Sequence, residues 1–220
     1  MLTKIYMGLK EIPFTYHWIV RRLIGGDINT VLDIGCGNGE FMEVVSKGKN
    51  WVITGVDLHD ASLKHAKQKS VYSKLIKSDV VKISKEVTRS KYDLVFCSQV
   101  IEHLNKKDGL KAMRIWEKLA KKRVLVSTPL DFIPYHRIEL TRKTTNPLNV
   151  HLSGWTPDEF EKLGYTVYGQ GSKLVYGENG LLRKTSKIFW PLLILLSFII
   201  SVFVYYFPNF ATYIVAVKNK

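Results

Sequence analysis

The segment from Val31 to Glu40 constrains the fold of this chain more than any other feature. It reads VLDIGCGNGE, so an apolar run with the character of a buried strand leads into three glycines at alternate positions, and a helix-like pattern follows. Glycines at such a strand-to-helix turn permit a sharp bend and let a ligand approach the backbone without a Cβ in the way. A glycine-rich turn alone is a weak signal, because tight strand–helix packing also favours it.

Strand and helix patterns alternate on either side of this loop, which indicates an α/β fold with a parallel sheet. Further apolar, β-branched runs predict strands at 30–34, 51–57, 74–77, 92–98, 123–128 and 165–170. Helical patterns lie between them at 40–47, 60–69 and 106–120, and another helix opens at Thr156-Pro157 with Thr156 as its cap. The stretch 129–151 is basic and has no periodicity, so we interpret it as a long functional loop.

Three carboxylates strengthen the glycine loop as an indication of a ligand-binding site. Asp33 lies two residues before its first glycine, Asp57 ends the second predicted strand, and Asp79 follows the third. The carboxyl ends of parallel strands meet at one edge of a sheet, where such sheets bind ligands. Each acid alone is more typical of a cap or a solvated turn, but together they favour an adenosine ligand, with Asp57 accepting ribose hydroxyls and Asp79 the adenine amine.

The form of the loop narrows the ligand further. A dinucleotide site normally reads G-x-G-x-x-G and faces a pyrophosphate, whereas this loop reads G-x-G-x-G and Asp33 would repel a pyrophosphate. The combination resembles the class I methyltransferases that use S-adenosylmethionine. The correspondence covers five motifs of that family, at Val31–Glu40, Val56–Leu58, Ser78–Val80, Tyr92–Leu104 and Val124–Pro129.

This resemblance implies a doubly wound, Rossmann-like sheet of seven strands, mostly parallel with an antiparallel last strand. The closing hairpin would pair Tyr165–Gln170 with Ala211–Val217. The resemblance also implies S-adenosylmethionine as the cofactor and assigns residues to its parts. The glycines would cradle it, Asp33 would lie near its amino end, and the other contacts would come from Gly35, Gly37, Gly39, Asp57, Leu58, Asp79, Val80, Ser98 and Gln99.

The residue that handles the proton of the acceptor is less well defined by the sequence. His103 is the leading candidate for a base, with Glu102 beside it, because the family motif places this pair just past the methyl-donor end. A Glu-His pair at a helix start is also often a capping or packing pair. His151, close to Trp155, is a second candidate that could line the acceptor pocket or simply fix its loop.

A metal site is a separate question at this position. Quinone-pathway O-methyltransferases and some RNA-end methyltransferases, which the chain resembles here, carry E-x-x-E-H and use those groups as ligands. Gln99 replaces the first acid, so only Glu102 and His103 remain, and two ligands make a poor site unless His136 or His151 approaches. We therefore predict no metal.

The C-terminal part of the chain carries a long uncharged stretch. Residues 188–217 contain no Asp, Glu, Lys or Arg, and 17 of the twenty residues 188–207 are apolar. As one helix this segment would be about 30 Å long, the thickness of a bilayer core, so hydropathy alone predicts a transmembrane helix. A single span would separate two strands that must pair, which leaves three alternatives: a re-entrant or shallow segment, a span without the last strand, or a buried helix pair.

The charge and the N-terminal segment complete the predicted organisation. The chain has 33 Lys and Arg against 19 Asp and Glu, a net charge of +14, and a basic helix at 106–123 would attract anionic lipid or RNA. Residues 14–24 predict an amphipathic helix, either a lid packed on the core or a helix that binds lipid or substrate. We predict four parts: an N-terminal helix (1–27), a methyltransferase domain (28–187), a hydrophobic membrane-associating segment (188–207), and a last strand with a basic tail (208–220).

The functional prediction combines these features. We expect a methyltransferase held at a membrane, with its catalytic domain on the cytoplasmic side, acting on a small or lipid-linked acceptor through O-, C- or N-methylation. Two cysteines are too few for a disulfide scaffold and agree with a reducing compartment. The alternatives are an RNA or protein methyltransferase docking through the basic surface, which we favour less, and a non-enzymatic membrane module that retains a cofactor fold.

Overall fold

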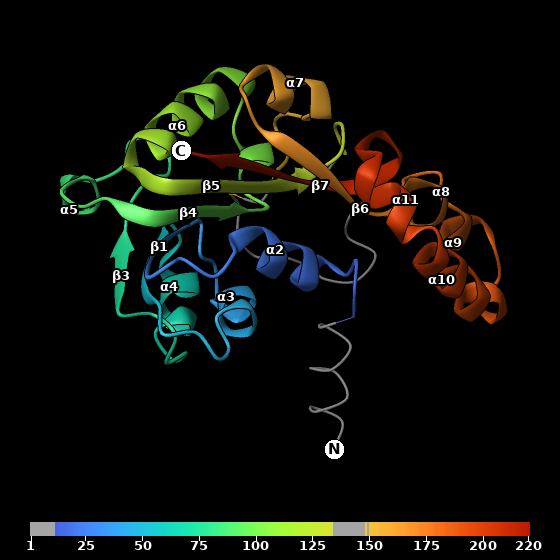
Figure 1. The fold of residues 1–220 in the computed structure, drawn as a ribbon, viewed down its shortest axis with the longest axis horizontal. Helices are drawn as coiled ribbons and strands as arrows, with labels where there is room; N and C mark the ends of the chain where they lie inside the picture. Colours follow the sequence, from blue (N-terminus) through green and yellow to red (C-terminus); the bar gives the residue numbers. More distant parts are fainter. Residues whose placement is uncertain (1–11, 134–147, 149) are drawn as a thin grey trace.

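The computed structural model describes residues 12–133, 148 and 150–220, and it shows a seven-stranded sheet with helices on both faces (Figure 1). The strand order is β3-β2-β1-β4-β5-β7-β6, and β7 runs antiparallel to both β5 and β6 while the other pairs are parallel. The predicted seven-stranded, Rossmann-like sheet with an antiparallel last strand is confirmed. The strands are β1 (Thr30–Ile34), β2 (Val52–Asp57), β3 (Lys74–Lys77), β4 (Tyr92–Ser98), β5 (Ala120–Pro129), β6 (Thr166–Ser172) and β7 (Ala211–Asn219).

The helices form two layers. In Figure 1, α2, α3 and α4 lie on one side of the sheet, and α6 and α7 lie on the other. The helices that precede β6 in the chain are α2 (Tyr16–Ile24), α3 (Glu40–Val45), α4 (Asp60–Ala66), α5 (Lys85–Thr88), the 3-10 turn η1 (Ile101–His103), α6 (Lys106–Leu119) and α7 (Pro157–Lys162). The predicted start of α7 is confirmed, because Thr156 and Glu159 form a reciprocal capping box and Pro157 occupies the first turn.

Each face of the sheet has its own apolar core. On one face, Trp116 of α6 and Phe160 of α7 are fully buried against β1, β4 and β5. On the other face, Ile19 of α2 and Met42 of α3 pack against Phe96 and its neighbours. The strands are therefore apolar on both sides, which is the pattern of a parallel sheet covered by helices. The N-terminal helix packs on the core, as the lid alternative requires.

A helical appendage connects β6 to β7. It consists of α8 (Lys173–Tyr176), α9 (Leu181–Lys184), η4 (Lys187–Phe189), α10 (Trp190–Ile199), α11 (Ser201–Tyr206) and η5 (Pro208–Phe210). Figure 1 shows α9 and α10 projecting away from the sheet beyond β6, whereas α11 lies close to it. Gly169 of β6 permits that close approach, because a Cβ there would meet the backbone oxygen of Val204 at 2.2 Å.

The prediction of a transmembrane helix over 188–207 is wrong for this structure. In the described part of the chain, none of the helices combines the length and the apolar character that a bilayer crossing needs. The helix is interrupted at Ile200, between α10 and α11. The alternative of a span without the last strand also fails, because β7 lies inside the sheet between β5 and β6. A buried helix pair does not describe it either, since most apolar side chains of α10 are exposed.

Candidate active site

The glycine loop joins β1 to α3 at the carboxyl edge of the sheet. Gly35, Gly37 and Gly39 all have positive φ angles, of 67°, 55° and 79°, in the region that only glycine adopts without strain. A Cβ on Gly35 would lie 2.3 Å from Val100, and one on Gly39 would lie 2.8 Å from Tyr72. Nothing lies within 4 Å of a Cβ on Gly37. The outer two glycines are therefore required by packing, whereas Gly37 faces open space that a ligand could fill.

Asp57 holds the loop in place. Its Oδ2 accepts a hydrogen bond of 2.9 Å from the Gly37 amide, and its Oδ1 accepts one of 2.8 Å from the His59 amide. The carboxylate thus lies directly beside the open position of the loop, and Leu58 next to it is exposed. This placement agrees with the predicted ribose site, and the role of both residues in binding stays a prediction.

Asp33 lies deeper than its predicted role requires. Its side chain is 4% exposed, and its Oδ2 accepts a hydrogen bond of 2.7 Å from the hydroxyl of Tyr72. Burial raises the pKa of Asp33 to about 7, the Tyr72 hydrogen bond opposes this shift, and the nearby Asp57 charge adds to it. Tyr72 is a residue that sequence reasoning missed, because it belongs to no motif and comes from the loop before β3.

The residues of the predicted adenine site, Asp79 and Val80, lie in a turn that hydrogen bonds to backbone and side-chain groups hold in place. Oδ1 of Asp79 accepts hydrogen bonds from the amides of Val81 and Lys82, at 2.6 and 2.8 Å, so this carboxylate also orders the turn after β3. The Val80 carbonyl oxygen accepts a hydrogen bond of 3.0 Å from the buried Trp116 indole, which ties the turn to α6. The turn is therefore held rigid beside the end of β3.

Ser98 and Gln99 end β4 in an unusual conformation. Gln99 has a φ of 55°, and its side-chain amide donates to the Ser127 hydroxyl at 3.2 Å. Such strain in a residue other than glycine is typical of functional sites. The Ser98 hydroxyl lies 2.6 Å from the Tyr16 hydroxyl of α2, and the Tyr16 ring packs against Phe41. Tyr16 is a second residue that no sequence motif indicated.

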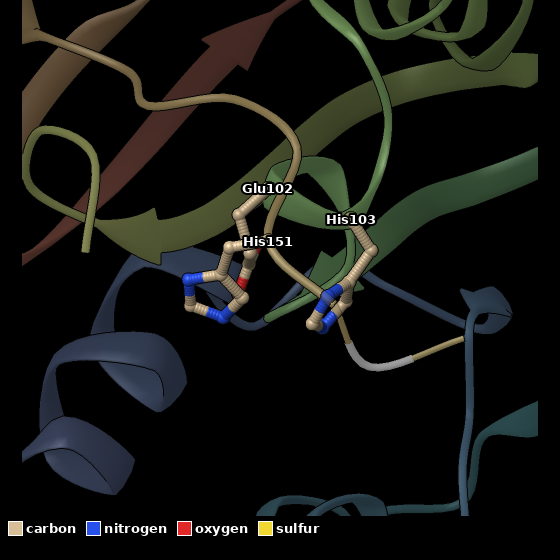
Figure 2. Close-up of side chains that lie close together, drawn as sticks. All are labelled: Glu102, His103 and His151. Atoms are coloured by element: carbon tan, nitrogen blue, oxygen red, sulfur yellow. The ribbon is translucent and has the colours of Figure 1, made fainter. Parts of the chain in front are cut away.

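Glu102, His103 and His151 come together at the start of the predicted acceptor side (Figure 2). One donor atom from each lies within 4.8 Å of the other two, and the two imidazole centroids are 4.9 Å apart. The loop that carries His151 is fixed by the Glu102 backbone, whose carbonyl oxygen accepts from the amides of Leu152 and Ser153 at 2.8 and 3.1 Å. All three candidates for proton handling therefore occupy one place.

The two imidazoles share a tautomer. Nδ1 of His103 lies 3.2 Å from the Val150 carbonyl oxygen, and Nδ1 of His151 lies 2.8 Å from the Ile133 carbonyl oxygen. A carbonyl oxygen only accepts, so each Nδ1 donates, and the lone pair of each neutral ring is on Nε2. Burial is the main cause that lowers the pKa of both rings, with the neighbouring His151 adding to the effect on His103. Both histidines are thereby favoured as neutral bases or ligands.

Glu102 is the buried member of this group. Its side chain is 2% exposed, and Oε2 accepts a hydrogen bond of 3.1 Å from the Thr128 hydroxyl. Burial raises the pKa of Glu102 to about 8. One carboxylate and two imidazoles, each imidazole oriented by a carbonyl oxygen on Nδ1, are a set of groups that suits a divalent transition metal. The structure thus brings His151 beside Glu102 and His103, where a metal site would need its third ligand; His136 lies outside the described residues.

Comparison with known proteins gives the same family as the motifs. Residues 31–123 match the family described as a methyltransferase domain. Over 78 residues the chain is 35% identical to the ubiquinone biosynthesis O-methyltransferase of Saccharophagus degradans, an alignment that covers 34% of this chain and 32% of that protein. The chain therefore spans about a third of the length of this curated relative.

Solved structures share the fold over nearly the whole chain. A SAM-dependent methyltransferase from Archaeoglobus fulgidus has a TM-score of 0.56 at 19% identity, covering 98% of this chain and 100% of that one. The small RNA methyltransferase HEN1 has a TM-score of 0.59 at 16% identity, covering 92% of this chain and 24% of that one. These likenesses concern the fold alone. The family match identifies residues 31–123 as a methyltransferase domain, and the likenesses to solved methyltransferases extend its fold over nearly the whole chain.

Proposed function

We propose that this chain transfers a methyl group from S-adenosylmethionine to a hydroxyl group of a small, apolar or lipid-linked acceptor. The observation that carries the proposal is the cluster of Glu102, His103 and His151: the first two follow β4 closely, at the sheet edge that also carries the glycine loop, and His151 lies beside them. A donor site and a group able to take a proton therefore share one edge. The Saccharophagus degradans relative is an O-methyltransferase by name, which supports a hydroxyl acceptor.

The donor side requires positioning more than chemistry, because the cofactor supplies the reactivity of the methyl group. The open position at Gly37 would take the cofactor close to the backbone, with Asp57 beside it for the ribose hydroxyls. Asp79 and Val80 would hold the adenine, and Gln99 would face the methionine part. In-line displacement then depends on these contacts holding the sulfur, the methyl carbon and the acceptor oxygen in one line.

The acceptor side must remove a proton from the attacking hydroxyl. Nε2 of His103 or His151 carries a lone pair and can accept that proton near neutral pH. Glu102, His103 and His151 would also hold a divalent cation, and such a cation would supply a lower pKa for a hydroxyl bound to it. In either case the two imidazoles orient the acceptor oxygen, because their rings are fixed through Nδ1.

The class of acceptor follows from the surroundings of the site. We place the catalytic domain at the cytoplasmic face of a membrane, which would deliver an apolar or lipid-linked substrate to it. The exposed apolar side chains of the appendage between β6 and β7 support this location, and so does the excess of basic residues, which would be attracted to anionic lipid.

Cofactor binding is the first test. We expect calorimetric titration of the full chain with S-adenosylmethionine to show one site, and the Asp57→Ala variant to bind at least about tenfold more weakly, because it loses a charge-assisted contact. Asp60→Ala removes a neighbouring exposed carboxylate and should leave the affinity unchanged. Absence of binding by the intact chain would refute the proposal.

Methyl transfer is the second test. Labelled S-adenosylmethionine should transfer its label to a lipid extract and not to RNA or protein fractions. We expect His103→Gln and His151→Gln to lose transfer about a hundredfold or more while retaining cofactor affinity, since removing a general base costs that much. If chelation abolishes transfer and a divalent metal restores it, the cation is part of the site; transfer that resists chelation assigns the proton to a histidine alone. Label found only in RNA would contradict the proposed acceptor.

A further inference from the structure

The appendage between β6 and β7 exposes many large apolar side chains. In α10, Leu193 and Ser197 are buried, whereas Leu192 and Ile199 are each 65% exposed. Exposed apolar surface of this extent, rimmed by polar residues, marks an interaction site on a folded protein. We name this surface the apolar face; it comprises Ile188, Phe189, Leu192, Ile194, Leu195, Leu196, Phe198, Ile199, Val202, Phe203, Tyr206, Phe207 and Phe210.

The apolar face is attached to the sheet at both ends. The chain leaves the sheet at Ser172 and re-enters it at Ala211, and these two residues are directly paired in the antiparallel ladder. The Tyr205 ring stacks on the Tyr168 ring with centroids 4.6 Å apart, and Gly169 lets the backbone of α11 lie against β6. The apolar face is therefore carried on a fixed base, and whatever it enters, it enters and leaves from the same side.

The dimensions of α10 and α11 match one leaflet. A helix rises 1.5 Å per residue, so the ten residues of α10 extend about 15 Å and the six residues of α11 about 9 Å. The hydrocarbon core of a bilayer is about 30 Å thick, so one leaflet contributes half of it. A segment that must turn back within this length reaches into the near leaflet and returns.

The border of the apolar face is basic and aromatic. Arg183 and Lys184 end α9, and Lys187 lies over the Trp190 ring at 5.7 Å from its centroid. Between Lys173 and Lys187 the sequence contains one acidic residue, Glu178. Such a border matches the headgroup region of an anionic bilayer, where Trp is enriched and each basic residue adds attraction. A second copy of the chain fits less well, because a two-fold contact would bring the same basic borders together.

We infer that the apolar face of α10 and α11 inserts into one leaflet of an anionic bilayer, with Arg183, Lys184 and Lys187 at the level of the headgroups. The inference rests on the proposed function and deepens it, because it names the partner as an anionic lipid surface and the appendage as the part that binds it. The anchor is monotopic: it lies in the membrane surface and is built between two paired strands.

Vesicle flotation of the full chain tests the inference. We expect binding to vesicles of phosphatidylcholine mixed with phosphatidylglycerol, and weaker binding to phosphatidylcholine alone or at high salt. The double variant Leu192→Glu/Ile199→Glu should bind about tenfold more weakly or worse, because it places charge where apolar side chains enter the lipid. Val52→Glu makes the same change at an exposed apolar residue of β2, 55% exposed, and should bind like the wild type.

Depth measurement completes the test. Fluorescence of Trp190, taken as the difference between wild type and Trp190→Phe, should be quenched most by lipids brominated near the headgroup. Quenching strongest at the bilayer centre would overturn a one-leaflet anchor. So would a reversible dimer in lipid-free solution that Leu192→Glu/Ile199→Glu abolishes, because that would assign the apolar face to a second copy.

Cofactor calorimetry separates this inference from the proposed function. A chain that binds S-adenosylmethionine but not anionic vesicles would refute the anchor and leave methyl transfer standing. A chain that binds vesicles but not the cofactor would do the reverse. Because Leu192 and Ile199 lie outside the cofactor site, their variants should retain the wild-type affinity for S-adenosylmethionine, which also verifies that they are folded.

Discussion

At the scale of single residues, Asp33 is expected to meet a cationic ligand group as a carboxylate, but its burial disfavours the charged form. The family motif places an acid there for a cationic ligand group, yet the side chain is buried and bonded to the Tyr72 hydroxyl. A buried carboxylate without a cation is more stable protonated. Asp33 therefore holds a proton more tightly than an exposed aspartate does, and we predict that a positive charge brought by the cofactor would favour its ionised form.

The raised pKa predicts how stability varies with pH. Burial raises the pKa of Asp33 from 3.8 to about 7, so its contribution to stability is complete below about pH 4 and is lost as the pH rises through 7. The Asp33→Asn variant lacks this loss. The difference in unfolding free energy, variant minus wild type, should therefore increase by up to about 4 kcal/mol from pH 4 to pH 8. Urea denaturation across this range measures it, with the exposed Asp60→Asn as the control; parallel curves for Asp33→Asn and wild type would contradict it.

Gly37 allows a matched comparison of strain and ligand contact. Gly37 and Gly48 both have positive φ, and nothing lies within 4 Å of a Cβ at either position. Alanine at each should cost about 1 kcal/mol of stability, because both backbones are left-handed. Only Gly37→Ala should weaken S-adenosylmethionine binding, by about tenfold or more, since only that Cβ enters the proposed ligand space. Denaturant unfolding and calorimetry measure the two effects, and equal cofactor affinity in both variants would show that Gly37 does not face the cofactor.

At the scale of elements, α2 links the N-terminal segment to the chemistry at the end of β4. One face of this helix is buried in the core through Ile19, Val20 and Ile24. Packing of that face brings the Tyr16 hydroxyl to Ser98. The position of the helix is therefore set by apolar packing, and we predict that its Tyr16 hydroxyl contributes to the site through Ser98.

Tyr16→Phe tests this role. The variant keeps the ring contact with Phe41 and loses the hydroxyl that contacts Ser98, so we expect it to fold normally. Methyl transfer at saturating cofactor should fall about tenfold, the value of one hydrogen bond in a buried site. Tyr206→Phe removes an exposed hydroxyl on α11 and should leave the rate unchanged. A wild-type rate for Tyr16→Phe would make α2 a packing element only.

At the scale of the whole molecule, β7 joins the parallel part of the sheet, which ends at β5, to the edge strand β6. It pairs with β5 from Arg123 to Pro129 and with β6 from Thr166 to Ser172, so it is the only connection in the sheet between the parallel body and β6 among the described residues. Lys218 adds a contact to Glu117 of α6 at 3.0 Å. The strand that follows the appendage is thus an internal part of the sheet.

Removal of β7 should therefore affect the whole fold. A chain that ends at Phe210 leaves β6 without a partner and exposes the buried side chains of β5, so we expect no cooperative thermal transition. A chain lacking only Lys220 keeps both ladders and should melt like the full-length protein. Circular dichroism during heating distinguishes the two. A cooperative transition in the shorter chain would mean that β1 to β5 fold independently of the hairpin.

Much of the fold, and the placement of the glycine loop and its carboxylates at one sheet edge, could be predicted because their signals are local. A strand, a glycine turn and a helix at Val31–Glu40 are adjacent in the chain, and the carboxyl ends of successive parallel strands must meet at one edge. The contacts of Tyr16, Tyr72 and His151 could not be predicted in this way. Each joins segments far apart in the sequence, and no local pattern states which side chain packing will bring to the site.

The apolar segment at 188–207 shows most clearly the difference between what the local sequence determines and what long-range strand pairing determines. The sequence by itself determined that this stretch is uncharged and seeks an apolar environment, because transfer free energies add up residue by residue. Only the tertiary structure decided that it turns back: β6 and β7 must pair, and that long-range hydrogen bonding returns both ends to one sheet. Hydrophobicity is a sum over neighbouring residues, whereas strand pairing is a constraint between distant ones.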